Sequence, residues 1–113
     1  MNRGLIINVA NGKKVDFNAA PGQAQKLIGI DASLGNGQAL TINNDGQLNF
    51  NNFNKGIAVH GGDSTTQLNI NGGETNFNNF NQSGIDASKK FAGEISIQDA
   101  HINTNSTRDS TGS

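Results

Sequence analysis

Short stretches of alternating apolar and polar residues recur along this chain at a nearly constant spacing. Leu40-Thr41-Ile42-Asn43 is followed by Leu68-Asn69-Ile70-Asn71 and then, at almost the same offset, by Ile95-Ser96-Ile97-Gln98. Alternation with a period of two is typical of a β-strand that buries one face. The spacing of an amphipathic helix is absent, and the frequent Gly and Asn residues oppose helix formation. The pattern therefore predicts a succession of short strands.

Two further segments repeat with the same period. Leu48-Asn49-Phe50-Asn51-Asn52-Phe53-Asn54 returns one period later as Thr75-Asn76-Phe77-Asn78-Asn79-Phe80-Asn81. Segments that begin at Gly29, Gly56 and Gly84 follow the same spacing. Each unit of about 27–28 residues thus holds three strands separated by Gly- and Asn-rich turns, the mark of a repeat architecture. We expect an all-β fold, a single-stranded parallel β-helix (β-solenoid) with three sides, about four rungs and right-handed coiling.

The repeat also predicts which side chains form the core. Stacked rungs lie about 4.8 Å apart, so equivalent residues contact one another. The expected inward columns are Leu40, Leu68 and Ile95; Ile42, Ile70 and Ile97; Phe50 and Phe77; Phe53 and Phe80; and Ile57 and Ile85. Asn43 and Asn71 fall at equivalent turns, where Asn tolerates a left-handed backbone and stacked amides can hydrogen-bond. We expect the solenoid to span residues 1–105 and a polar tail or linker to span 106–113.

Composition restricts the functions that fit this fold. Only 33% of the residues are hydrophobic and 15% are charged, Asn occurs nineteen times, and the net charge is −1. Without a basic stripe the chain is a poor nucleic-acid binder. No apolar run approaches the roughly 20 residues of a membrane-spanning helix. Without Cys there is no disulfide or thiolate chemistry.

Outward-facing amides provide the main candidate site. Asn49, Asn76 and Asn103 recur once in each repeat, and Gln47, Glu74 and His101 lie beside them. Regularly spaced amides on a flat sheet can pair with sugar hydroxyls, which makes this strip a candidate glycan-binding surface. The alternative is a structural ladder whose amides hydrogen-bond to one another.

Catalytic and metal chemistry have weaker support. Asp31 and Asp86 occupy equivalent outward positions two rungs apart, about 9.6 Å, a separation that an inverting glycosidase allows. However, no other acid or Arg accompanies them at equivalent positions. His60-Gly61-Gly62-Asp63 combines His and Asp in a Gly-rich turn, but a metal needs more ligands. We therefore expect no catalytic residue, no metal site and no cofactor.

The sequence of the rungs resembles that of a known group of proteins. Rungs such as Leu40-Thr41-Ile42-Asn43-Asn44-Asp45-Gly46-Gln47-Leu48-Asn49-Phe50 resemble those of pectate-lyase-like β-helix regions in large bacterial surface adhesins. The Asn-rich style is similar to cell-wall-anchored adhesins of lactobacilli and other Gram-positive bacteria, with Gram-negative autotransporter passengers as the second choice. The resemblance implies an extracellular or cell-surface location and attachment to glycans or matrix.

Three functions remain open at this stage. The first is a non-catalytic adhesion module within a larger surface protein. The second is a structural stalk without a ligand of its own, and the third is a polysaccharide-degrading β-helix such as a tailspike or lyase fragment. Expected partners are a glycan or matrix ligand, further rungs of a parent chain, or other copies that stack on uncapped ends.

Overall fold

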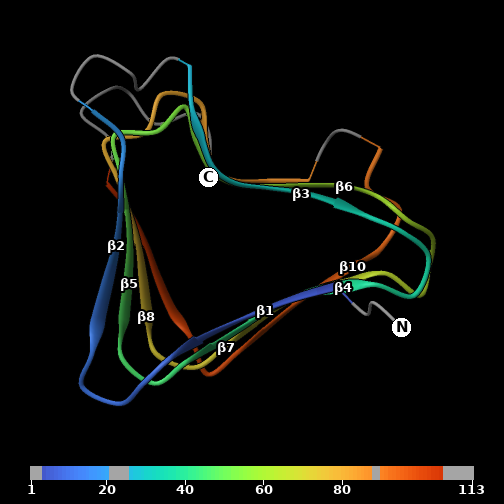
Figure 1. Ribbon diagram of the computed structural model, residues 1–113, viewed down its shortest axis with the longest axis horizontal. Helices are drawn as coiled ribbons and strands as arrows, with labels where there is room; N and C mark the ends of the chain where they lie inside the picture. The colour runs from blue at the N-terminus through green and yellow to red at the C-terminus, as the bar shows by residue number, and fades with distance from the viewer. Residues whose placement is uncertain (1–3, 21–25, 88–89, 106–113) are drawn as a thin grey trace.

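A computed structural model describes residues 4–20, 26–87 and 90–105. The described residues form three parallel sheets that face one another around a common core (Figure 1). The first sheet contains β1 (Gly4–Val9), β4 (Ala39–Asn44), β7 (Gln67–Asn71) and β10 (Glu94–Gln98), in that order. The second contains β2 (Lys14–Asn18), β5 (Gln47–Asn51), β8 (Glu74–Asn78) and β11 (His101–Asn105). The third contains β3 (Ile28–Leu34), β6 (Lys55–Gly61) and β9 (Ser83–Asp86).

The chain visits the three sheets in turn, so each of the first three circuits lays one strand on every sheet, and the fourth adds β10 and β11. Leu40 pairs with Leu68 and Leu68 with Ile95, which reproduces the repeat found in the sequence. The first circuit is longer, and its Val15 pairs with Leu48. The expectation of an all-β parallel solenoid is confirmed, and no helix occurs among the described residues. Accordingly, none of those residues belongs to a helix able to span a membrane.

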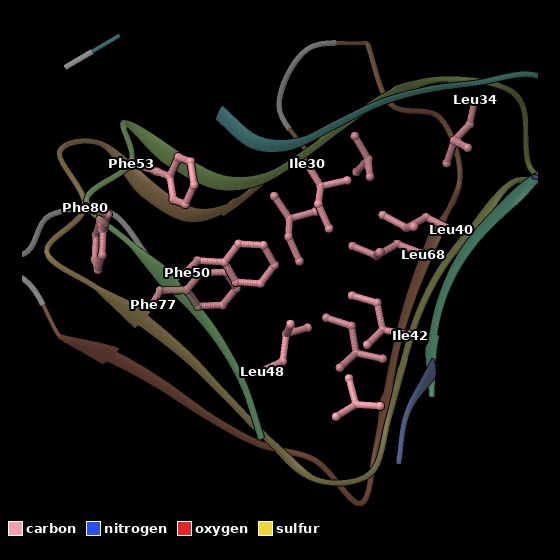
Figure 2. Close-up of a cluster of buried hydrophobic side chains, with 14 of the residues drawn as sticks. Ile30, Leu34, Leu40, Ile42, Leu48, Phe50, Phe53, Leu68, Phe77 and Phe80 are labelled. Carbon is pink, nitrogen blue, oxygen red and sulfur yellow. The ribbon is translucent and has the colours of Figure 1, made fainter. Parts of the chain in front are cut away.

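Apolar side chains from all three sheets fill the interior (Figure 2). Leu40, Ile42, Leu68 and Ile70 from the first sheet are fully buried, as is Ile57 from the third. Phe50 stacks between Phe17 and Phe77, with ring centroids 4.9 and 5.2 Å apart. Such stacks add to the roughly 1.5–3 kcal/mol that each buried side chain contributes. Phe53 and Phe80 are also buried, and they lie where the chain passes from the second sheet to the third (Figure 2).

A column of glycines makes room for the stacked rings. Gly56 of β6 is equivalent in the repeat to Gly29 and Gly84, and all three lie against the Phe column. A Cβ atom on Gly56 would lie 2.2 Å from Cδ1 of Phe77, far inside van der Waals contact. The repeated Gly at the start of each third-sheet strand is therefore a packing requirement of the aromatic column.

Three details differ from the sequence analysis. Ile95 and Ile97 belong to the expected core columns by register, but they are 46% and 48% exposed because no described rung covers β10. Ile85 is only partly buried. Asn43 and Asn71 lie in strands, and the left-handed Asn residues are Asn52 and Asn79, with φ of 70° and 57°.

The remaining expectations concern positions at the chain ends. The proposed tail, residues 106–113, lies outside the described residues. So do residues 1–3 of the proposed solenoid segment. The described part of that segment carries strands from Gly4 to Asn105.

Candidate functional site

The outward side chains of the second sheet form a continuous polar surface, here called the polar face. It contains a broad, shallow depression of about 610 Å³ whose lining residues are all polar or charged: Lys14, Asp16, Gln47, Asn49, Asn51, Glu74, Asn76, Asn78, Asn103 and Asn105. Parallel register places them in columns that run along the solenoid axis. The sheet thus brings together residues that are far apart in the sequence.

Side-chain amides link the rungs of the polar face. Asn49 Nδ2 donates to Asp16 Oδ1, Asn76 Nδ2 to Asn49 Oδ1, and Asn103 Nδ2 to Asn76 Oδ1, each at 2.7 Å. The neighbouring column repeats the pattern from Asn18 through Asn51 and Asn78 to Asn105, at 2.7, 2.8 and 3.0 Å. Every link has the same direction: the later rung donates and the earlier rung accepts. These columns are therefore hydrogen-bonded ladders.

Glu74 is the carboxylate at the centre of the polar face. Its Oε2 accepts hydrogen bonds from Asn76 Nδ2 at 2.9 Å and Gln47 Nε2 at 3.1 Å. The bond from Asn76, then that from Gln47, and then the charge of nearby His101 hold the pKa of Glu74 below its ordinary value. Glu74 is therefore ionised at neutral pH and presents an acceptor-only group to solvent.

The structure separates the predicted site residues by accessibility. Asn49 and Asn76 are only 6% and 7% exposed because the stacked neighbours cover them. Gln47, Glu74 and Asn103 are partly exposed and line the depression. His101 pairs in register with Glu74 and is exposed, but it does not line the depression.

Other lining residues escaped the sequence-based site prediction. Lys14 and Asp16 come from the first circuit, where Val15-Asp16-Phe17-Asn18 matches the repeated Phe segment but carries a charged residue in place of the Asn. Asn51, Asn78 and Asn105 form a visible column in the sequence. That column could have been included, since its outward position follows from the same alternation that exposes Asn49.

The ladders determine what the polar face can bind. Both N–H groups of Asn76 are used, one by Asn49 and one by Glu74. The amide oxygens of Asn49 and Asn76 each accept one ladder bond, whereas an amide oxygen can accept two. The face therefore offers acceptors, from amide oxygens and the Glu74 carboxylate, together with donors, from Lys14 and from the second N–H of amides such as that of Asn49. Its chemical complement is a ligand rich in hydroxyl groups, which both donate and accept hydrogen bonds.

A second polar cluster lies on the outside of the third sheet. Asp31 and Asp86 flank Ala58 in one column, and a small cavity of about 70 Å³ lies over it. Asp31 Oδ1 lies 2.8 Å from His60 Nε2, and Asp86 Oδ2 lies 2.6 Å from Lys55 Nζ. Each carboxylate thus has its own basic partner, an arrangement that differs from two acids shared across a scissile bond.

The segment from His60 to Asp63 was expected to be a turn, but His60 and Gly61 end β6 and the turn begins after them. Asp63 accepts hydrogen bonds from the backbone N–H and the hydroxyl of Thr65, which lower the pKa of its carboxyl group. His60 points instead to Asp31 on the neighbouring rung. Among the described residues, no group of three or more His, Cys, Asp or Glu side chains is arranged to hold a metal ion.

Comparisons of the chain with models of protein families, with curated proteins and with solved structures found no match.

Proposed function

We propose that this chain is a non-catalytic adhesion module of an extracellular or cell-surface protein, which binds glycans or matrix through its polar face. The observation that supports the proposal is the depression lined only by polar side chains, which combine amide and carboxylate acceptors with amide and Lys14 donors. Sugars present dense arrays of hydroxyl donors, which complement such a surface. The axial ladders hold the acceptors in place, so binding needs little reorganisation.

The proposed adhesion role also agrees with a particular type of β-helix. We place the chain among three-sided, right-handed parallel β-helices of the pectate-lyase-like type found in bacterial surface adhesins. Right-handed coiling follows the general hand of parallel crossovers. A rigid solenoid presents a long flat surface to a polymer, as repeat proteins do with their extended faces. Parent-chain rungs or other copies are the expected partners at the ends.

A structural stalk is the second candidate, and a specific observation favours it. In the Asp16 column, each Asn uses one of its two amide N–H groups in a rung-to-rung bond of 2.7 Å. Rung-to-rung amide bonds of this kind are expected on a sheet whose side chains serve only to stabilise the stacked rungs. The polysaccharide-degrading β-helix is the less favoured alternative, since Asp31 is hydrogen-bonded to His60 and Asp86 is separately ion-paired with Lys55.

A glycan-array screen of the chain, with two variants, tests the proposal. The double variant Gln47→Ala, Glu74→Ala removes accessible groups of the depression and leaves the Asp16 ladder bonds in place. Asn69→Ala is the matched control, because Asn69 is a partly exposed ladder amide on the first sheet, bonded to Thr41 at 3.3 Å. Specific binding that the double variant loses and the control keeps supports adhesion by the polar face. A folded chain that binds neither a glycan on the array nor immobilised matrix protein refutes the adhesion role and leaves the stalk.

A further inference from the structure

Two Asn-Gly steps in this chain occupy matching exposed turns. Asn11-Gly12 lies between β1 and β2, and the turn is closed by a bond from Lys13 N to Ala10 O at 3.0 Å. Asn36-Gly37 lies between β3 and β4, closed by Gln38 N to Gly35 O at 3.1 Å. In each turn the Gly has a positive φ, 74° and 76°, as in the third position of a type II turn.

The chemistry of an Asn-Gly step depends on access to the glycine nitrogen. That nitrogen can attack Cγ of the preceding Asn, forming a five-membered succinimide as the Cγ–Nδ2 bond breaks and ammonia leaves. Water then opens the ring at either carbonyl, which gives aspartate or isoaspartate. The net change consumes one water and releases one ammonia, with no oxidant or reductant.

The two turns leave this reaction unobstructed. Asn11, Gly12, Asn36 and Gly37 are all exposed. The closing hydrogen bond of each turn uses the backbone nitrogen of the following residue, not that of the Gly. A Cβ atom placed on Gly12 would meet nothing within 4 Å, and one on Gly37 would meet only Thr65 Oγ1 at 3.9 Å.

The third Asn-Gly step, Asn71-Gly72, is held by the solenoid. Asn71 Nδ2 donates to Asn43 Oδ1 at 3.1 Å in an axial ladder. The attacking group, Gly72 N, donates to Gln98 O on the next rung at 2.8 Å. Both hydrogen bonds must open before a ring can form, so reaction requires local unfolding.

We propose that Asn11 and Asn36 are sites of spontaneous deamidation in the folded protein and that the rung-to-rung hydrogen bonds protect Asn71. The ladder residues Asn49, Asn76 and Asn103 are also spared, since Phe or Thr follows them and its side chain crowds the attacking nitrogen. Each event adds one negative charge to a chain of net charge −1. Modification is thus directed to the turns, away from the polar face.

Peptide mass spectrometry of the full chain, after timed incubation at mildly alkaline pH, tests this proposal. The native protein is expected to convert Asn11 and Asn36 at least about tenfold faster than Asn71, because two hydrogen bonds must open at Asn71. In concentrated urea the three sites are expected to react at similar rates. The variant Asn36→Gln, which disfavours the five-membered ring, should lose the signal at that site alone.

Three results would overturn the proposal. One is conversion of Asn71 in the native protein at the rate of Asn36. Another is a failure of Asn11 and Asn36 to react faster than the ladder residues. The last is continued protection of Asn71 in urea, which would show that its slow reaction does not come from the fold.

Discussion

Thr75 is the one buried side chain of the described residues whose polar atom has no hydrogen-bond partner. It is fully buried in an inward column, where its register neighbours are Leu48 and Ile102. A hydroxyl buried without a partner costs about 1–3 kcal/mol. Valine has nearly the same shape, so Thr75→Val removes that cost without a cavity. We expect the variant to raise the free energy of unfolding by about 1–2 kcal/mol.

Urea and thermal denaturation followed by circular dichroism measure this change. For a domain near 100 residues, each kcal/mol raises the melting temperature by about 4–8 °C. Thr66→Val is the matched control, because Thr66 is equally buried but its Oγ1 donates to Gly35 O at 2.8 Å and accepts from Asp63 N at 3.0 Å. The Thr66→Val substitution should lower the free energy of unfolding by about 1–3 kcal/mol, because both hydrogen bonds are lost. A Thr75→Val variant no more stable than the native chain, or two variants that shift in the same direction, would refute the reasoning.

Three further predictions follow from the packing and the ladders. The variant Gly56→Ala should lower the free energy of unfolding by about 1–3 kcal/mol, because the new Cβ would overlap the Phe77 ring. A urea midpoint equal to that of the native chain would contradict this prediction. Phe50→Asp or Phe77→Asp should abolish cooperative unfolding, since either places a carboxylate in the aromatic stack, so a retained calorimetric transition would count against the stacked core. Because the folded-state pKa of Glu74 lies below its ordinary value of 4.5, its contribution to stability is complete above that pH and is lost as the pH falls through the lowered pKa. Urea midpoints measured across acidic pH should therefore fall less steeply in Glu74→Gln, and identical slopes would show that the bonds from Asn76 and Gln47 are not formed in solution.

The repeat made much of the fold predictable. Equal spacing of Leu40, Leu68 and Ile95 implies one column, because a solenoid stacks equivalent residues, and the register agrees. Alternation then separates inward Phe50 from outward Asn49. Burial at the last rung was not predictable in the same way: Ile97 has the pattern of a core residue, but its exposure depends on whether another rung covers it.

The candidate site was predictable in position but not in chemistry. The recurrence of Asn49, Asn76 and Asn103 identified the outward column, but the direction of the amide bonds depends on side-chain rotamers, which spacing does not determine. Asp16 heads the ladder as an acceptor, because its carboxylate stands where the later rungs have an amide. The left-handed Asn residues lie at a different corner from the one expected: Asn52 follows β5, whereas Asn43 lies within β4. Asn tolerates that backbone at either corner, so the sequence does not distinguish them.

Side-chain amide NMR, with and without a glycan, tests the central claim most directly. The ¹⁵N-labelled chain would be titrated with oligosaccharides that end in mannose, galactose or N-acetylglucosamine. Binding by the polar face predicts that at least one oligosaccharide shifts the Gln47 side-chain resonances, with Asn69 on the first sheet unchanged. An unchanged Gln47 across all of these ligands, or shifts confined to Asn69, would contradict a glycan-binding polar face.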